Sequence, residues 1–216
     1  MKLLLNGSPD NSFNNHFTGP ASQVLGIAIQ TNGQILAAGR FNNIKPEVGI
    51  SGINPHRGLV RFNADGSLDT TFNRGPGINQ GPGPNALSCN EVELQPDGKI
   101  LVAGTFTAWT GDDLTAHLGN QLVRINSDGT VDTSFSSGIG FTSPSGFPIE
   151  TITTQSDGKI LVAGQFITVQ GNSIRGICRL NANGTVDTTF NNGGLGIEGT
   201  VREIQFLANG QIIVAG

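Results

Sequence analysis

The chain has 216 residues, of which 32 are glycine and only 13% are charged, and its formal net charge is −4. This length can bury a sizeable core, and abundant glycine without a Gly-X-Y period indicates tight turns and excludes collagen. The weak negative charge gives no general attraction to nucleic acid or acidic membranes, and the apolar runs are far too short to span a bilayer. The apolar run at Met1–Leu5 ends too soon for a signal peptide, so we expect no export signal.

The predicted elements begin with a half-repeat at residues 2–13, in which Gly7–Phe13 aligns with Gly66–Phe72. Three full repeats follow at about 22–72, 88–135 and 148–190, and a second half-repeat covers 200–216. Two phrases mark the repeats. The first is Asp-Gly-Lys-Ile-Leu-Val-Ala-Gly at 97–104 and 157–164, with looser copies at 32–39 and 209–216; the second is Asp-Thr-Thr/Ser-Phe at 69–72, 132–135 and 187–190. Two long phrases recurring in order predict a repeat architecture.

The second repeat shows how each unit is expected to fold. Apolar and polar residues alternate over Cys89–Gln95, Lys99–Thr105 is apolar on both faces, and further short strands are predicted at Gln121–Asn126 and Thr130–Phe135. Asn-Gly or Asp-Gly joins the first strand to the second and the third to the fourth, which favours two-residue type I′ turns with positive φ at both residues. The expected turn glycines are Gly33, Gly66, Gly98, Gly129, Gly158, Gly184 and Gly210.

These patterns predict an all-β fold, a β-propeller built of four-stranded antiparallel meander blades. A second strand that is apolar on both faces suits a blade packed between two neighbours, and a short Thr- and Asp-rich fourth strand suits an outer edge. We expect a single domain of three complete blades plus two half-blades, at 2–13 and 200–216. The half-blades would combine into a fourth blade, or the chain is a fragment of a longer propeller of about six to eight blades, the interpretation we favour.

The two phrases resemble a known family. Leu59–Phe72, which reads Leu-Val-Arg-Phe-Asn-Ala-Asp-Gly-Ser-Leu-Asp-Thr-Thr-Phe, and the Asp97–Gly104 phrase are similar to the delta-60 repeat, a β-propeller repeat of bacteria and viruses. The similarity covers nearly the whole chain, with departures at Pro9, where Leu68 stands in the matching repeat, and in the uneven spacing of the phrases. It implies large cell-surface or virion proteins with a binding or scaffolding role, and it carries over no catalytic motif.

The sequence contains no pattern typical of a catalytic, metal or cofactor site. His16, His56 and His117 lie in different loops without metal-ligand spacing, and the aspartates of the second phrase lack a calcium-loop pattern, so we expect them to bond local backbone amides. Cys89 and Cys178 stand where the other repeats mostly carry valine or isoleucine, which predicts buried thiols rather than a disulfide. We expect that the chain is not an enzyme and that it holds no cofactor and no metal.

The long connections are predicted to gather on one face, because every connection at the other end of the strands is a tight turn. They lie at about 40–57, 73–88, 105–120, 136–148 and 165–175. Long loops on a rigid scaffold are where binding usually occurs. The candidate binding residues are Trp109, Asp112, Asp113, His117, His56 and Arg57. A tryptophan beside carboxylates suits a carbohydrate or protein contact; the alternative is a loop anchor packed on its own blade.

These observations predict a non-enzymatic structural or recognition module. Its partners would be other protein subunits or surface carbohydrate, with no nucleic acid and no membrane insertion. The first hypothesis is a virion component, a tail or fibre protein of a tailed phage, because a surface-associated family occurs here without an export signal. The alternative is a bacterial extracellular adhesin or surface-protein fragment. A propeller-fold hydrolase or lyase is a remote third hypothesis.

Overall fold

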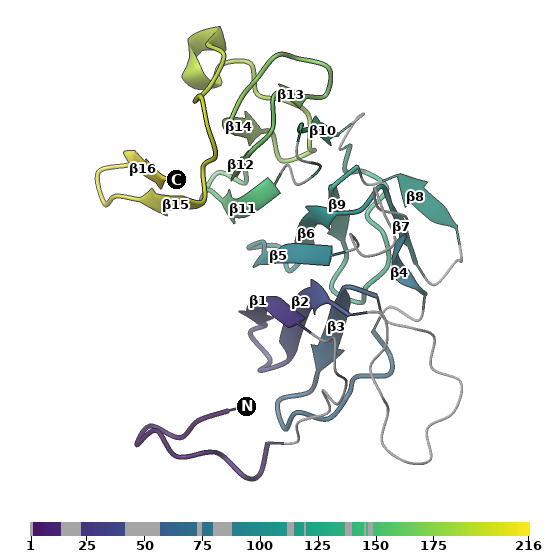
Figure 1. The fold of residues 1–216 in the computed structure, drawn as a ribbon. Helices are drawn as coiled ribbons and strands as arrows, with labels where there is room; N and C mark the ends of the chain where they lie inside the picture. The colour runs from purple at the N-terminus through teal and green to yellow at the C-terminus, as the bar shows by residue number, and fades with distance from the viewer. Residues whose placement is uncertain are drawn as a thin grey trace.

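A computed structural model of the chain consists almost entirely of short strands and tight turns, an all-β fold (Figure 1). Three sheets follow one another around an arc, with residues 2–13 at one end and the last two strands at the other. Among the described residues, no helix is long and apolar enough to cross a membrane. The structure describes residues 2–13, 23–41, 57–72, 75–79, 88–111, 115–118, 120–136, 140–144, 146 and 149–216.

Three antiparallel sheets of three strands repeat along the chain, and in each the strands pair in sequence order. The first contains β1 (Gln23–Ile29), β2 (Ile35–Arg40) and β3 (Leu59–Phe62). The second contains β5 (Ser88–Leu94), β6 (Ile100–Thr105) and β9 (Leu122–Ile125). The third contains β11 (Ile149–Thr154), β12 (Ile160–Gly164) and β14 (Ile177–Leu180). In the second sheet, each strand end lies within one residue of its predicted position.

The fourth strand of each repeat is reduced to a single antiparallel bridge. The bridges are Phe62–Leu68, Ile125–Val131 and Leu180–Val186. Pairing stops there because the next residue is the aspartate of the second phrase. Its carboxylate accepts the backbone N–H two residues later, as Asp132 does from Ser134, and the chain turns away. The strand that we expected over residues 130–135 is therefore shortened to one bridged residue, Val131.

Partial units occupy the two ends of the arc. β15 (Glu203–Phe206) and β16 (Ile212–Ala215) form a two-stranded antiparallel sheet that corresponds to β5 and β6. Residues 2–13 form a hairpin with one antiparallel bridge, Leu3–Pro9, which corresponds to β3 and its bridged segment. A single turn of 3-10 helix, η1 (Phe190–Gly193), follows the third sheet.

Two smaller sheets join the long connections to one another. One contains β4 (Gly77–Asn79), β7 (Ala108–Thr110) and β8 (Ala116–Leu118), and the other contains β10 (Phe141–Thr142) and β13 (Thr168–Val169). In both, a strand from the connection between two main sheets pairs with a strand from the long connection inside the later sheet. We did not predict these sheets from the sequence, because strands of two or three residues carry no measurable periodicity.

Eight tight turns share one backbone hydrogen-bond pattern, and the turn between β5 and β6 illustrates it. The Gly98 N–H donates to the Gln95 carbonyl oxygen, and the Gln95 N–H donates to the Lys99 carbonyl oxygen, each at 2.9 Å. Gly98 has a positive φ of 83°, whereas Asp97 does not and instead accepts the Lys99 N–H on its carboxylate at 3.0 Å. These are three-residue turns with a glycine bulge, not the two-residue type I′ turns expected. All seven predicted turn glycines have positive φ.

The glycine that ends each copy of the first phrase has a different role. An added Cβ at Gly104 would lie 2.0 Å from the Ser88 carbonyl oxygen. β5 bulges at this point, between Cys89 and Glu91, and the bulge brings its backbone against β6. Only glycine leaves room for this approach.

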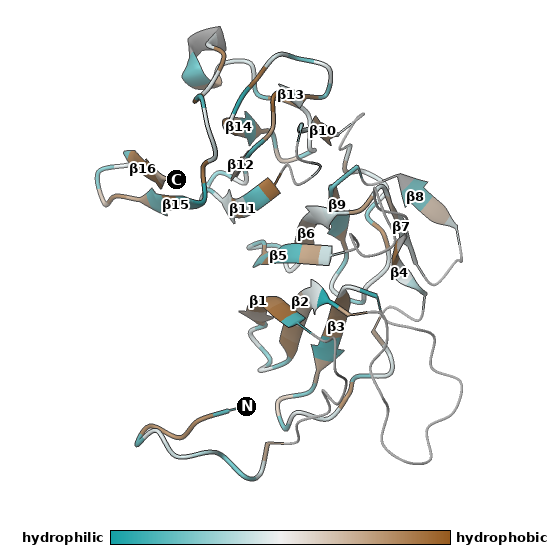
Figure 2. Ribbon diagram, in the orientation of Figure 1, coloured by the Kyte–Doolittle hydropathy of each residue, from teal (hydrophilic) through white to brown (hydrophobic). Residues whose placement is uncertain are grey.

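The core lies between neighbouring main sheets, and apolar residues recur in the strands of all of them (Figure 2). One cluster joins the first and second sheets and includes Leu36 and Val102; another joins the second and third and includes Leu101 and Val162. All four side chains are fully buried, and burying one such side chain contributes about 1.5–3 kcal/mol. The middle strands are therefore buried on both faces, as predicted, and hold the sheets face to face.

Candidate functional site

An ion-paired network repeats beside the turns of all three main sheets. In the second sheet, Asp132 Oδ2 accepts hydrogen bonds from Arg124 Nε at 2.7 Å and from Lys99 Nζ at 2.8 Å. The other oxygen, Oδ1, accepts the Ser134 N–H at 3.0 Å. Arg124 lies on β9, Lys99 precedes β6 and Asp132 follows the bridged segment, so the network ties three parts of the sheet together.

The same network recurs in the other sheets with one replacement. In the third sheet, Asp187 accepts from Arg179 and Lys159, both at 2.8 Å. In the first sheet, glutamine takes the place of the lysine, and Gln34 donates to Asp69 at 2.9 Å. The aspartates accept hydrogen bonds from local backbone amides, which confirms the prediction. Sequence reasoning missed the arginine, although it precedes the aspartate by eight residues in every repeat.

The aspartates of this network stay charged at neutral pH. Burial acts to raise the pKa of Asp132, but hydrogen bonds from Lys99 and Ser134 outweigh it and hold the pKa well below its ordinary value. Hydrogen bonding from Lys159 is the largest influence on Asp187 and lowers its pKa in the same way. A carboxylate held in this state suits a structural anchor and not a general acid or base.

The arginines also reach from one sheet to the next. Arg61 Nη1 donates to the Ser127 carbonyl oxygen, and Arg124 Nη1 donates to the Ala182 carbonyl oxygen, both at 2.5 Å. The acceptors lie in turns of the following sheet. The Arg124 guanidinium carbon also lies 4.6 Å from the centre of the Phe135 ring. The surface formed by the tight turns, here called the turn face, is therefore held together by charges that satisfy one another.

The opposite surface, here called the loop face, consists of β4, β7, β8, β10 and β13 with their flanking residues. A glycine with positive φ lies where each connection meets the preceding loop: Gly77 begins β4, Gly140 precedes β10, and Gly196 forms an isolated parallel bridge to Arg175. An added Cβ at Gly77 would lie 2.6 Å from the Arg57 carbonyl oxygen, and one at Gly140 would lie 2.4 Å from the Asn120 carbonyl oxygen. These glycines let each connection pack on the long loop of the preceding sheet, which fixes the loop face to the scaffold.

Trp109, the predicted centre of binding, is a core residue. It lies on β7 between Ile78 of β4 and His117 of β8, and its side chain is fully buried in the cluster that joins the first two sheets. This corrects the expectation of a surface contact and agrees with the alternative of a packed anchor. β4, from the preceding connection, pairs with β7 and places the buried Ile78 opposite Trp109 in the same core cluster. Among the described residues, the indole Nε1 has no hydrogen-bond partner.

The remaining candidate residues fall in and around the same small sheet. His117 is partly buried on β8, and Arg57 is partly buried and forms a parallel bridge to Gly77 of β4. The structure thus brings Trp109, His117 and Arg57 to one part of the loop face. The other candidates, Asp112, Asp113 and His56, lie outside the described residues, as does His16.

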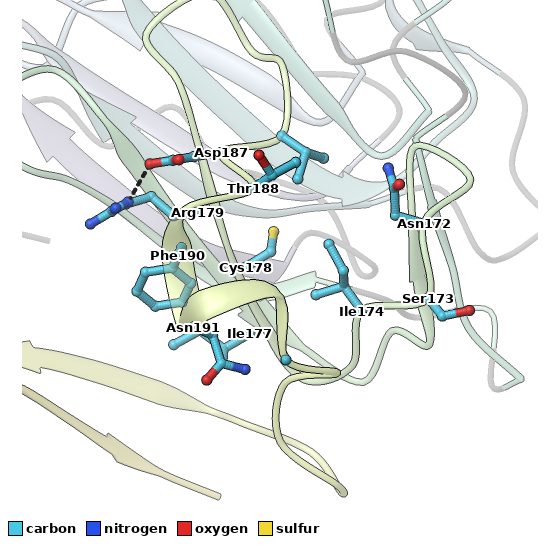
Figure 3. A pocket seen from close by; sticks show the side chains of 12 residues that line it. Asn172, Ser173, Ile174, Ile177, Cys178, Arg179, Asp187, Thr188, Phe190 and Asn191 are labelled. Carbon is cyan, nitrogen blue, oxygen red and sulfur yellow. Dashed lines mark hydrogen bonds and ion pairs between the residues drawn. The ribbon is translucent and has the colours of Figure 1, made fainter.

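A shallow pocket of about 240 Å³ lies beside the outermost segment of the third sheet (Figure 3). Its walls include Ile174, Cys178, Asp187, Phe190 and Asn191. The Asp187 carboxylate is bonded to an arginine, the dashed line in Figure 3, so it is not a free acid. The second sheet has an equivalent pocket of about 200 Å³ beside Asp132. Both pockets are lined by residues of the ion-paired network, and neither has the features of a reaction site.

Glutamates also lie on the first strands of three sheets, β5, β11 and β15. Burial raises the pKa of Glu91 on β5 to about 7, with a smaller effect from the charges of Glu93 and Glu203. In the part of the chain that the structure describes, no group of three or more His, Cys, Asp or Glu residues could hold a metal ion. Cys89 and Cys178 are free and buried, as predicted, and burial raises the pKa of both thiols, which makes them poor nucleophiles.

Comparison with known proteins identifies the family. The model of DUF5122, a β-propeller domain of unknown function, matches residues 30–72, 95–135 and 155–190, more than half of the chain. The chain belongs to this family. Each DUF5122 match contains one complete network of the kind formed by Lys99, Arg124 and Asp132. The propeller class predicted from the repeats is therefore correct.

The other comparisons add little. No curated protein matches the chain. Among solved structures, the WD40 β-propeller domain of Doa1 is similar over 94% of this chain and 77% of its own length, with 9% identity and a TM-score of 0.29. A likeness at this level carries no argument about the fold.

Proposed function

We propose that each main sheet and its bridged segment form one four-stranded blade. The three complete blades would be residues 22–72, 88–135 and 148–190, with half-blades at 2–13 and 200–216. The support is the repetition of strand order, register and ion-paired network in all three sheets. The narrower assignment to delta-60 repeats is supported by the two recurring phrases alone.

On this architecture, the chain is a non-enzymatic recognition and scaffolding module that binds its partner through the loop face. The observation that carries this proposal is the difference between the two faces. On the turn face, charged groups are paired with one another, whereas the loop face presents exposed side chains such as Ala116 and Thr142 on strands fixed to a rigid scaffold. A pre-organised surface of this kind loses little entropy on binding.

The partner is another protein subunit or a surface carbohydrate, and the setting is the virion of a tailed phage. The alternative setting is the surface of a bacterium. Antibodies against the 216-residue chain would be used in immunogold electron microscopy of purified phage particles and of uninfected cells from the source. Gold on tails or fibres supports the virion, gold on intact uninfected cells supports the adhesin, and gold on neither contradicts both.

The binding face can be tested once a labelled virion subunit or glycan binds the chain. Ala116→Arg places a large charge on the loop face, and Ser156→Arg places the same charge on the turn face, both at exposed positions. We expect the first to weaken binding at least tenfold and the second to change it less than twofold. Equal losses, or loss with Ser156→Arg alone, would contradict the assignment.

A further inference from the structure

We propose that the pocket beside the third sheet binds one uncharged pyranose ring, the end residue of a surface glycan. The inference rests on the proposed function, since it assigns carbohydrate, one of the two partner classes named there, to the loop face. The pocket lies at the border of that face, because residues 172–174, which follow β13, form one of its sides (Figure 3).

The pocket forms where the outermost segment leaves the third sheet. After the bridge to Val186, the Asp187 carboxylate accepts the Thr189 N–H at 3.0 Å, and the chain turns away from β14. No further strand covers this part of β14 among the described residues, and its Ile177 and Cys178 line the pocket. The end of the long loop and η1 supply the remaining sides. The opening is therefore built into the fold of this repeat.

The charged groups of the pocket are paired with one another. Of the residues that line it, only Arg179 and Asp187 are charged, and they form a hydrogen bond of 2.8 Å. Asp187 also accepts from Lys159 Nζ at 2.8 Å and from the Thr189 hydroxyl at 2.6 Å. The Arg179 guanidinium carbon lies 4.9 Å from the centre of the Phe190 ring. The pocket thus attracts neither anions nor cations, and its chemistry favours an uncharged ligand.

The mouth of the pocket carries uncharged polar side chains. Ser173, Thr188 and Asn191 are exposed, and within the described part of the chain their side chains make no hydrogen bond. A hydroxyl or an amide can both donate and accept. Asn191 is held in place by its backbone, which has a φ of 55° and accepts the Gly194 N–H at 2.7 Å. An added Cβ at Gly194 would lie 2.7 Å from Asn191 Nδ2, so the glycine leaves room for the amide.

Apolar groups face one another below these polar side chains. Ile174 of the long loop and Phe190 of η1 lie on opposite sides of the pocket (Figure 3). A pyranose ring matches this arrangement, because its C–H groups can pack on the apolar walls while its hydroxyls donate and accept at the mouth. A wholly apolar ligand would cover the polar groups without bonding them. The volume of about 240 Å³ is below the range of about 300–1,000 Å³ that drug-sized ligands occupy, which suits a single ring.

The pocket beside Asp132 provides an internal comparison. Thr133 and Phe135 line it at the repeat positions of Thr188 and Phe190. Among the described residues, however, it is lined by no serine or asparagine, and His117 is the residue that β8 contributes. The second pocket therefore lacks most of the polar mouth, and we assign the sugar to the third sheet alone.

The first test uses the 216-residue chain and saturation-transfer NMR. The probes are the methyl glycosides of glucose, galactose, mannose and N-acetylglucosamine. We expect at least one to bind with a dissociation constant in about the millimolar range, because a ligand of about a dozen non-hydrogen atoms can gain little affinity. Methyl glucuronide has the glucose ring with a carboxylate, and it should bind no more tightly than methyl glucoside. Absence of binding by all four neutral glycosides, or tighter binding of the glucuronide, would overturn the proposal.

The second test locates the site by substitution. Thr188→Val replaces the hydroxyl with a methyl group, and Asn191→Gly removes the amide while permitting the positive φ. Each should weaken the bound glycoside about 3–10-fold, with circular dichroism unchanged. Thr133→Val is the matched control from the second pocket and should change binding by less than about twofold. Unchanged binding in both third-sheet variants, or an equal loss in the control, would overturn the assignment.

Two further measurements separate this inference from the proposed function. Ala116 does not line the pocket, so Ala116→Arg should leave glycoside binding unchanged even where it weakens a partner on the loop face. N-acetylleucine amide serves as a probe for a protein side chain. If it binds in the pocket and no glycoside does, the carbohydrate assignment fails while recognition through the loop face stands. Failure of the proposed function would instead appear as equal losses of partner binding in Ala116→Arg and Ser156→Arg.

Discussion

Arg124 donates a hydrogen bond to the Ala182 carbonyl oxygen in the neighbouring sheet, while its Nε atom binds Asp132 in its own sheet. One guanidinium therefore couples strand pairing inside a sheet to packing between sheets. The side chain is only 7% exposed, so its charge is stable there only because both sets of acceptors are present.

The first prediction compares the two cations that bind Asp132. Arg124→Gln should lower the free energy of unfolding by about 3–5 kcal/mol, because it breaks a buried ion pair with Asp132 and removes the donor to the Ala182 carbonyl oxygen of the next sheet. Lys99→Gln should lower it by less than about 1 kcal/mol, since the lysine is 30% exposed and the first sheet already uses Gln34 at this position. Urea unfolding followed by circular dichroism measures both. Equal losses would mean that the bond to the next sheet adds nothing.

The second prediction concerns Trp109. Because the ring is fully buried between two sheets, Trp109→Ala should lower the free energy of unfolding by about 3–5 kcal/mol. Trp109→Phe keeps much of the packing and removes the indole N–H that lacks a partner, so we expect a loss of less than about 2 kcal/mol. If Trp109→Ala keeps the wild-type unfolding midpoint, the ring is not a core residue.

The strands of the main sheets were predictable because burial alone imposes their pattern. Val92 and Leu94 alternate with glutamates on a strand whose apolar residues face one core cluster, and Ile100 begins a strand buried on both faces. The position of each turn was predictable, but its type was not. Asx-Gly suits both turn types, and the choice depends on whether the Asx residue adopts positive φ or, as at Asp97, uses its side chain to hold the next N–H.

The candidate site was less predictable because it depends on residues brought together by tertiary structure. The burial of Trp109 follows from β4, a three-residue strand of an earlier connection with no pattern of its own. The arginine–aspartate network depends on sheet register, although the repeated spacing from Arg61 to Asp69 could have revealed it. Asp112 and Asp113 remain predictions, since they lie outside the described residues.

The third prediction separates two causes of glycine at positive φ. At Gly98, nothing lies within 4 Å of an added Cβ, so Gly98→Ala should cost only the strain of the left-handed backbone, about 1–2 kcal/mol. At Gly140, the Cβ would also lie 2.4 Å from the Asn120 carbonyl oxygen, which must move. We expect Gly140→Ala to lower the free energy of unfolding by at least about 1 kcal/mol more than Gly98→Ala. Indistinguishable thermal midpoints would show that this connection does not pack as described.

The last prediction concerns pH, where Glu91 and the network aspartates act in opposite directions. Burial raises the pKa of Glu91 from 4.5 to about 7, so between these values the folded chain binds more protons than the unfolded chain. Its contribution to stability is therefore full below pH 4.5 and is lost as the pH rises to about 7. For Asp132, the pKa is lowered from 3.8, so its contribution is present above pH 3.8 and is lost as the pH falls below it.

We expect Glu91→Gln to remove a large part of the decline in the urea midpoint between pH 4.5 and pH 7, because the neutral amide has no proton to lose. Glu93, whose pKa is also raised by burial, is responsible for the remainder. The decline in more acidic solution should remain, since it belongs to the aspartates. Glu198→Gln is the matched control, because the Glu198 side chain is 89% exposed and should leave the whole profile unchanged. If the Glu91→Gln midpoint falls between pH 4.5 and pH 7 as steeply as the wild type, another group is responsible for the loss of stability.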